Sequence, residues 1–503
     1  MFSTTDGSPA YDCIVVGGGP AGSAAATLIA LQGHDVMLLE KEREPKYKIG
    51  ESLLPSTVHG ICPLLGVSEE LKNANFTLKR GGTFRWGTSP EPWTFDFAAS
   101  SKMAGPTSTA YQVERMVFDR ILLDNASKKG VRVRPGCKVR GALTTGDRVT
   151  GLEFVNEAGE PEAALARYVI DASGYESILA RRVGERVFSK YFQNVAVFGY
   201  FENGGRMAEP CAGNIFCAAF EDGWFWYIPL RPDLTSVGVV LDKSRADVLK
   251  GGLPETLDHF IAKCEPIKQL LANARRITEG VYGEVRARQD YSYSNSRFWS
   301  EGIALVGDAA CFVDPVFSSG VHLATYSALL AARSVNTCLR GDLDEEACFT
   351  EFERRYRREY ANFYDFLVAF YNLEQDLPSY FWQAKRITNS SELEQQAFID
   401  LVGGVGGNDE RLFDTATFFQ EREHLSETLF PAASSAYGHA ERDGKRGAFF
   451  LELTSEITQM QLQAMFGGKR PADRPLFADG LVPERDGLHW AEPATAVAPS
   501  RHR

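Results

Sequence analysis

Hydrophobic and polar positions in the first forty residues follow the order strand, turn, helix, strand. The run YDCIVV, which begins at Tyr11, is a short apolar strand, and VMLLE, which ends at Glu40, is a second one. An Ala-rich stretch that ends at Gly33 joins them and has the composition of a helix. Together these segments predict a βαβ unit.

Further along the chain, strand patterns and helix patterns alternate. Residues 76–97 predict a β-hairpin, because glycines and a proline interrupt the apolar positions there: Gly81, Gly82, Gly87 and Pro90. The stretch 111–128 predicts a helix. Residues 130–170 alternate as antiparallel strands do and end in the apolar strand ARYVIDASG.

The middle of the chain is rich in strands. Four apolar runs between residues 190 and 245 predict a second sheet: NVAVFGYF, NIFCAAF, WFWYIPL and TSVGVVL. GIALVGD at 302–308 predicts one more buried strand, and a long helix is expected from Ser319 to Leu339. A sheet placed between parts of a βαβ domain suggests a layer that covers the substrate.

Residues 344–373 predict a helix with one apolar and aromatic face. Its members are three and four positions apart: Phe349, Phe352, Tyr356, Tyr360, Phe363, Leu367 and Phe370. Core packing explains this face; docking of a partner and the lining of an open substrate surface are the alternatives.

The pattern as a whole predicts an α/β protein. We expect residues 1–343 to form one module, with the second sheet inserted at about 190–295. A mainly helical region should follow at 344–485. The polar stretch 486–503, which contains prolines and alanines, predicts a disordered tail.

Composition excludes several classes of function. The chain has 503 residues and a net charge of −12, so binding to nucleic acid or to anionic lipid has no electrostatic support. No signal peptide precedes the first strand, and the stretch Ile14–Ala30 is too weakly apolar to span a membrane, so we expect a cytoplasmic protein without a stable membrane anchor. Nine cysteines without a CxxC pair argue against a zinc site and a disulfide framework.

The turn after the first strand, VVGGGPAGS, has the spacing of a dinucleotide fingerprint. Gly17 permits the tight turn, Gly19 lets a pyrophosphate approach the helix N-terminus, and Gly22 lets the helix pack close to the strand. Pro20 and Ala21 complete the motif. At the end of the second strand, Glu40 can accept a hydrogen bond from a ribose hydroxyl, and we place Lys41 beside it in the same site.

The residues at two later strand ends indicate that the dinucleotide is FAD rather than NAD. DASG follows one strand, and GDAA followed by PVFSSG ends another. With the fingerprint, these motifs resemble the p-hydroxybenzoate-hydroxylase-like class of FAD enzymes. The resemblance implies that Asp308 binds the ribityl chain and that the next helix points its N-terminus at the flavin. It also implies that Arg115 contacts the FAD diphosphate, although a surface helix would equally account for this arginine.

The strand WFWYIPL indicates which members of this class of FAD enzymes the chain resembles. Trp224, Trp226, Ile228 and Pro229 form WxWxIP, which resembles the signature of flavin-dependent halogenases. Residues two apart share a strand face, so both indoles should project the same way. Beside a flavin they would keep an organic substrate from the flavin while a halide could still reach it. Two ordinary core tryptophans are the alternative.

A second motif of the halogenases is KxGxxFRWG, which begins at Lys79. Strand alternation places Thr77 and Lys79 on one face and Leu78 on the other, and Arg80 opposite Lys79. The resemblance implies that Lys79 lies between flavin and substrate. A desolvated amine has a lowered pKa and can donate a hydrogen bond to hypohalous acid or become a haloamine. A solvated strand lysine is the alternative.

A third motif, DPVFSSGVHLA, resembles the halide site of the family. It assigns the halide to Ser319 and Gly320, with Gly320 and Val321 also at the flavin, and a helix N-terminus suits chloride there. Ser319 as a simple helix cap is compatible with this role. KIGESLLP, from Lys48 to Pro55, resembles a loop near the flavin.

These motifs predict a reduced-FAD-dependent halogenase. The FRWG and SSG motifs resemble phenol- and pyrrole-type members, which implies a separate flavin reductase and an aromatic substrate tethered to a carrier protein. The expected reaction is chlorination through a flavin hydroperoxide and hypochlorous acid. A flavin monooxygenase or a prenyl reductase on the same fold is the alternative, and a non-enzymatic protein that retains the fold is a third.

Overall fold

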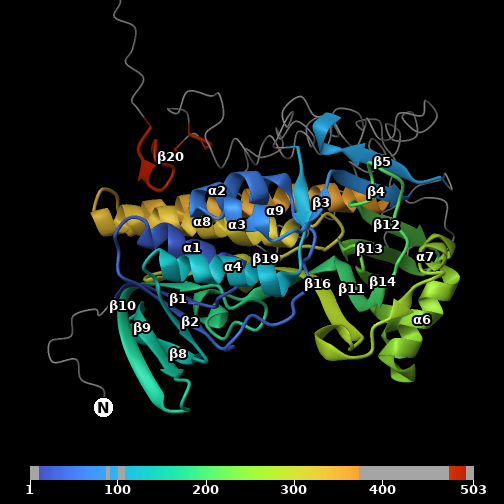
Figure 1. Cartoon of the computed structure of the whole chain (residues 1–503). Helices are drawn as coiled ribbons and strands as arrows, with labels where there is room; N and C mark the ends of the chain where they lie inside the picture. Colours follow the sequence, from blue (N-terminus) through green and yellow to red (C-terminus); the bar gives the residue numbers. More distant parts are fainter. Residues whose placement is uncertain (1–10, 87–90, 100–107, 373–474, 478, 494–503) are drawn as a thin grey trace, which may run out of the picture.

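The computed structural model describes residues 11–86, 91–99, 108–372, 475–477 and 479–493. Two sheets form the body of the protein, at opposite ends in Figure 1, and long helices run across them. The expected turn residues Gly87 and Pro90, most of the expected helical region 344–485, and residues 494–503 lie outside the described residues.

The first sheet contains the predicted βαβ unit. Strands β1 and β2 are parallel, with α1 between them, and Gly17 donates its N–H to the carbonyl of Leu39. The sheet order is β17-β18-β10-β1-β2-β7. Its elements are β1 (Tyr11–Val16), α1 (Pro20–Ala30), β2 (Val36–Glu40), β7 (Arg132–Pro135), β10 (Pro161–Asp171), β17 (Trp299–Ser300) and β18 (Ile303–Leu305). The parallel core places the carboxyl ends of β1, β10 and β18 at one edge.

Strand β10 serves two layers. Its first half pairs antiparallel with β9 (Arg148–Val155), which pairs with β8 (Lys138–Thr145). Its second half, which includes Asp171, runs parallel to β1. The antiparallel strands expected at 130–170 are therefore present, except that β7 joins the parallel sheet.

The second sheet has the order β19-β16-β11-β14-β13-β12-β4-β5 and is antiparallel apart from the β4–β12 pair. Its strands are β4 (Gly81–Arg85), β5 (Trp93–Asp96), β11 (Arg186–Glu202), β12 (Ile215–Phe220), β13 (Gly223–Arg231), β14 (Leu234–Asp242), β16 (Arg286–Asn295) and β19 (Cys311–Phe312), with β15 (Arg275–Arg276) at the side of β11. The expected hairpin at 76–97 is β4–β5. Strand β3 (Thr77–Lys79) instead pairs with β6 (Ala110–Gln112).

Both faces of the central strands β12, β13 and β14 are buried. Phe225 and Tyr227 of β13 point into a small core, whereas Trp224, Trp226 and Ile228 point into the main core shared with the first sheet. The helices that cover the small core are α6 (Leu253–Lys263) and α7 (Glu265–Leu270), which follow η3 (Lys243–Gly251). One strand thus separates two apolar layers.

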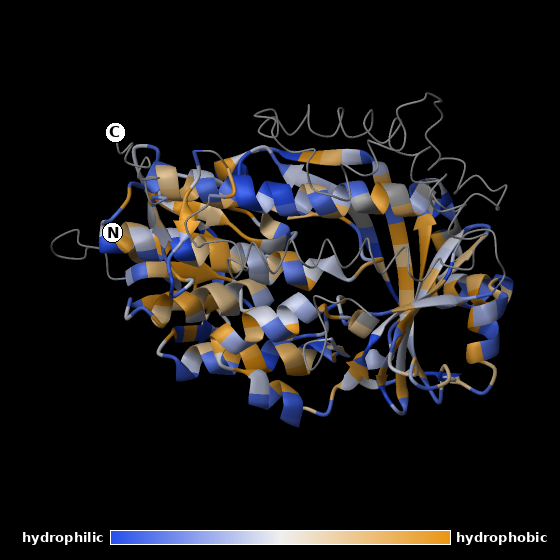
Figure 2. Cartoon of the chain, turned by 90° about the horizontal axis from the view of Figure 1, so that it is seen from above, coloured by the Kyte–Doolittle hydropathy of each residue, from blue (hydrophilic) through white to orange (hydrophobic). Residues whose placement is uncertain are grey.

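Long helices pack over both sheets (Figure 1). Helix α8 (Ser319–Arg340) begins at the predicted residue, and α4 spans Arg115–Lys128. The helices carry both hydrophobic and hydrophilic residues (Figure 2). The shorter elements are η1 (Ser56–Ile61), α2 (Cys62–Leu65), α3 (Ser68–Asn73), η2 (Phe97–Ala99), α5 (Ala180–Val183), η4 (Gly280–Tyr282) and η5 (Gly307–Ala309). None of the helices within the described residues has the length and apolar character needed to cross a membrane.

Helix α9 (Glu345–Asn372) belongs to the main core. It packs against α8, and the seven residues of its apolar face are all at most 3% exposed. Core packing is therefore the correct interpretation of that face. These aromatic side chains pack against both sheets, as Phe349 does against Tyr168 of β10 and Phe370 against Phe84 of β4.

The prediction of a disordered tail is wrong for residues 486–493. They end a short hairpin, β20 (Val482–Pro483) with β21 (Trp490–Ala491). Trp490 is fully buried between Arg333 and Arg355, whose guanidinium carbons lie 5.1 and 4.9 Å from its ring centroid. A single large aromatic residue supplies enough apolar area to hold a polar segment in place, and composition averaged over the segment hides it.

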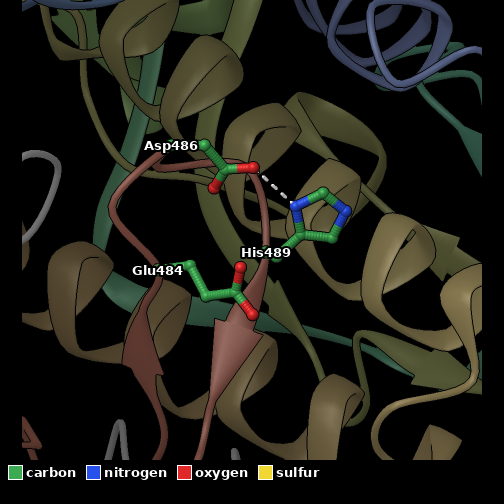
Figure 3. A group of neighbouring side chains, drawn as sticks. All are labelled: Glu484, Asp486 and His489. Atoms are coloured by element: carbon green, nitrogen blue, oxygen red, sulfur yellow. Dashed lines mark hydrogen bonds and ion pairs between the residues drawn. The ribbon is translucent and has the colours of Figure 1, made fainter.

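The hairpin also carries a group of possible metal ligands: Glu484, Asp486 and His489 (Figure 3). Their ligand atoms lie within 4.8 Å of one another. His489 Nδ1 is 2.7 Å from Asp486 Oδ2, and Arg340 binds the Glu484 carboxylate through both of its terminal nitrogens. The Arg340–Glu484 pair joins the hairpin to the end of α8, whereas the His489–Asp486 contact lies within the hairpin.

Replacing Trp490 should test this anchor. Trp490→Ala removes a fully buried side chain, and we expect the free energy of unfolding to fall by about 3–5 kcal/mol. Ile178→Ala is the control, since Ile178 is 53% exposed and should change stability by less than about 0.5 kcal/mol. Urea unfolding of both variants measures the difference; equal stability would show that the hairpin adds nothing.

Candidate functional site

The glycine turn after β1 has the geometry of a dinucleotide cradle. Gly17 has φ +102°, which disfavours any other residue, and a Cβ on Gly22 would overlap the Gly17 carbonyl oxygen. Above Gly19 there is open space, with no atom within 4 Å of the position that a Cβ would occupy. Pro20 and Ala21 open α1 and are buried. The turn therefore leaves room for a ligand at one glycine while the others are packed.

Glu40 and Lys41 lie at the end of β2, as predicted. Oε2 of Glu40 accepts from the N–H of Gly18 at 2.5 Å, and Oε1 accepts from the N–H of Glu42 at 2.8 Å. Glu40 thus holds the glycine turn in shape, and its carboxylate retains lone pairs for a ribose hydroxyl. Lys41 pairs with the exposed Glu176 at 3.1 Å.

Asp308 follows β18 at the same edge of the sheet. Burial raises its pKa, while Arg288, Arg115, Arg186 and Lys48 oppose that rise. Four cations around one carboxylate leave a positive field, which suits the two negative charges of a dinucleotide diphosphate. The residues present therefore fit FAD.

Arg115 is held in a defined position. It forms a two-nitrogen ion pair with Asp119, and Nη1 donates to the Ile49 carbonyl at 2.6 Å. A Cβ on Gly50 would lie 2.9 Å from Nη1 of Arg115 and 3.7 Å from Val321. The structure thus brings Arg115 and Val321, two predicted cofactor residues, to the same glycine of the loop 48–55.

The two indoles form a wall on one face of β13, as the spacing predicts. Trp224 and Trp226 are 1% and 3% exposed, and their ring centroids lie 6.2 Å apart. Nε1 of Trp226 donates to Ser236 at 3.2 Å, and the ring covers Gly238 so closely that a Cβ there would overlap it. Both indoles are therefore fixed by a hydrogen bond or by shape, and neither can rotate out of the core.

Lys79 lies buried beside this wall. It is 3% exposed, its Nζ donates to the Leu53 carbonyl at 3.0 Å, and no carboxylate pairs with it among the described residues. Burial lowers the pKa of Lys79 to about 7. Nζ also lies 5.6 Å from the Phe97 ring centroid. Arg80, as expected, points away and is exposed.

Cys217 lies close to both Lys79 and Trp226. Cys217 faces Trp226 across the β12–β13 pair, so the two side chains share a sheet face. Lys79 and Cys217 are close enough to perturb each other's pKa, and burial raises that of the thiol. The amine therefore lies on the same side of β13 as the tryptophans.

Asp314 joins the wall to the predicted halide loop. Nε1 of Trp224 donates to Tyr371 at 2.7 Å, and the Tyr371 hydroxyl donates to Asp314 at 3.0 Å. The Asp314 carbonyl in turn faces Ser319 Oγ at 3.4 Å. Tyr371 and Asp314 were not predicted. Asp314 lies within the halide motif, but no sequence signal connects Tyr371, near the end of α9, with a tryptophan of β13.

The predicted halide loop turns sharply before α8. Ser318 has φ +60°, Ser319 is fully buried, and open space lies above Gly320. The first N–H groups of a helix have no intrahelical acceptor. A 22-residue helix thus begins at a position where backbone donors and room for a small anion coincide.

Comparisons with known proteins agree with this site. The family described as tryptophan halogenase matches residues 12–106 and 99–429. A tryptophan 2-halogenase of Chondromyces crocatus is 34% identical over 403 residues, which cover 78% of this chain and 75% of that protein. The chain belongs to the flavin-dependent halogenases.

Solved halogenase structures share the whole fold. The myxobacterial chondrochloren halogenase CndH is 50% identical, with a TM-score of 0.77 over 96% of this chain and 99% of that one. CmlS, a flavin-dependent halogenase, is 32% identical, with a TM-score of 0.72 over 95% of this chain and 83% of that one. The chain is therefore a flavin-dependent halogenase, and members of this class bind FAD and generally need a flavin reductase.

The halogenase site contains a buried carboxyl that the motif analysis missed. Tyr200 donates to Oε1 of Glu51 at 2.5 Å, and burial raises the pKa of Glu51 to about 7. Glu51 lies in KIGESLLP, so the motif itself was the available signal. Its segment pairs with residues 111–113, beside β6 and β3, which is how Leu53 comes to face Lys79.

The lowered pKa of Lys79 predicts a pH dependence of stability. Between pH 7 and 9 the folded halogenase loses this proton, whereas the unfolded chain, with a pKa near 10.5, retains it. Stability should therefore rise with pH relative to Lys79→Met, by about 2 kcal/mol between pH 7 and 9. Urea unfolding of both proteins at pH 7, 8 and 9 measures this difference; a constant difference would show that the amine titrates normally.

Proposed function

We propose that this halogenase chlorinates an electron-rich aromatic ring, phenolic or pyrrolyl, that is tethered to a carrier protein. A separate reductase supplies reduced FAD, and bound FAD with oxygen supplies the oxidising power that turns halide into electrophilic halogen. The observation that carries the proposal is the buried amine of Lys79 on the indole side of β13, which pairs with no carboxylate of the described residues.

The indole wall separates two kinds of reactant. Trp224 and Trp226 are held by Tyr371 and Ser236, so a bulky ring cannot displace them without breaking hydrogen bonds. A small electrophile can pass where an aromatic substrate cannot. This supports halogenation over direct hydroxylation, because hydroxylation needs the organic ring next to the flavin.

Lys79 receives or steers the electrophile. With a pKa of about 7, a large fraction of the amine is neutral at physiological pH, and a neutral amine has the lone pair needed to accept positive halogen. The Leu53 carbonyl orients the remaining N–H. An ordinary exposed lysine would be almost fully protonated and would only donate hydrogen bonds.

Ser319 and Gly320 are the proposed chloride site. The helix dipole and first-turn N–H groups of α8 stabilise an anion there, and Gly320 leaves the space for it. The chain Ser319–Asp314–Tyr371–Trp224 keeps this site at a fixed distance from the wall.

Removing the Lys79 amine should stop halogenation of the substrate without stopping the oxidation of reduced FAD. Lys79→Ala should lower halogenated product by at least about 100-fold, while oxidation of reduced FAD continues at a rate similar to that of the unmodified enzyme. Lys72→Ala, on the exposed side of α3, is the control. Mass spectrometry measures product and absorbance follows the flavin. Retained halogenation by Lys79→Ala would remove this residue from the mechanism.

The substrate class can be tested with one pair of reactions. Enzyme, reductase, FAD, oxygen and chloride are supplied with either free tyrosine or a tyrosyl carrier protein. We expect the chlorine isotope doublet only in the carrier-bound product. Chlorinated free tyrosine would overturn the tethered substrate, and oxygen incorporation without chlorine would favour a monooxygenase.

A further inference from the structure

Three buried polar side chains from distant parts of the chain form one hydrogen-bonded row. Ser56 begins η1, His322 lies in the first turn of α8, and Glu359 lies on α9. The Ser56 hydroxyl is 3.0 Å from Nδ1 of His322, and Nε2 is 2.8 Å from Oε1 of Glu359. The three residues are 0%, 0% and 4% exposed.

The imidazole has a single orientation. Nε2 faces the Glu359 carboxylate and Nδ1 faces the Ser56 hydroxyl, so both ring nitrogens have a hydrogen-bond partner. Tyr326 stacks on the ring with centroids 5.8 Å apart and planes 12° apart, and Phe363 lies 5.7 Å away. The ring can therefore neither flip nor leave.

The row has the order of a hydrolase triad, Ser–His–Glu, but it does not have the access of one. The hydroxyl of Ser56 is completely buried, so no ester or amide can reach it. A structural or positioning role remains.

Ser56 and His322 belong to the two segments on which halogen transfer depends. Ser56 follows the segment that presents the Leu53 carbonyl to Lys79, and the Leu54 carbonyl accepts from the first N–H groups of η1. His322 is three residues after Ser319, so both lie on the same side of the first turn of α8. The Ser56–His322 bond thus ties the support of the amine to the halide loop.

Stability alone does not require polar groups here. Well-packed apolar residues of similar volume would hold buried segments together as well, because they avoid the cost of desolvating a serine, a histidine and a carboxylate. Apolar contacts allow sliding, whereas directional hydrogen bonds fix distance and angle. The row is suited to setting a relative position.

We propose that His322 is a positioning residue for halogen transfer. Its bonds to Ser56 and Glu359 lock the segment that carries Leu53 onto the first turn of α8, and so set the separation between the Lys79 amine and the halide at Ser319–Gly320. This inference rests on the functions proposed above for Lys79 and Ser319.

Two variants remove the hydrogen bond between Ser56 and residue 322. Ser56→Ala removes the hydroxyl, and His322→Gln places an amide near the Nε2 position, where it can still pair with Glu359 but not with Ser56. His322→Asn is the converse, because its amide lies near the Nδ1 position. Ser334→Ala is the matched control: Ser334 is also fully buried on α8, and its Oγ donates to the Cys348 carbonyl of α9 at 2.8 Å.

Three measurements are made on each variant: the ratio of halogenated product to reduced FAD oxidised, the affinity for bromide from the visible spectrum of bound FAD, and the melting temperature. Ser56→Ala and His322→Gln should lower the product ratio about 10-fold or more and weaken bromide binding, since a displacement of about 1 Å suffices for such losses. Flavin oxidation should stay within about 2-fold of the unmodified rate. His322→Asn should retain more of the product ratio than His322→Gln.

A structural role would give a different result. If Ser334→Ala lowers the product ratio as much as Ser56→Ala does, loosening of the α8–α9 contact explains the effect and the proposal is wrong. Unchanged product ratio and bromide affinity in Ser56→Ala and His322→Gln would also overturn it. Absence of product in the unmodified enzyme would instead count against the proposed substrate, and the bromide titration would still decide the role of His322.

Discussion

The cost of burying the Lys79 ammonium group governs the arrangement of this site. In water this amine would keep its proton, but in the core it has one carbonyl partner and no carboxylate among the described residues. Desolvation destabilises the charged form of the amine, and this lowers the pKa of Lys79 to about 7. A chain tolerates such a group only where the surrounding fold is stable enough to offset it, and here Leu53, Phe97 and Cys217 surround the amine.

The second sheet supports this site because its central strands β12, β13 and β14 are buried on both faces. On β13, Phe225 and Tyr227 anchor the strand to the small core under α6 and α7, which leaves the opposite face free to carry indoles. The strand cannot shift in register by one residue without exchanging these sets. The indole wall is therefore as rigid as the sheet that carries it.

Hydrogen bonds then connect parts that pack in different layers. Trp224, Tyr371 and Asp314 link the sheet, α9 and the proposed halide loop. Ser56, His322 and Glu359 link η1, α8 and α9. Helix α9 takes part in both rows. Trp490 of the hairpin contacts both long helices, since its ring lies by Arg355 of α9 and its Nε1 donates to Ser334 of α8.

Local sequence by itself determined the βαβ unit, the start of α8, the shared face of Trp224 and Trp226, and the burial of the α9 stripe, because periodicity and glycine spacing act over a few residues. It also pointed to Lys79 and to the halide loop through motifs. Tertiary structure alone decided which distant groups meet: Tyr371 with Trp224, Cys217 with Lys79, His322 with Ser56, and the hairpin at 482–491 with α8. Such contacts join residues tens to hundreds of positions apart, and pattern along a chain carries no information about them, since they depend on how whole layers stack.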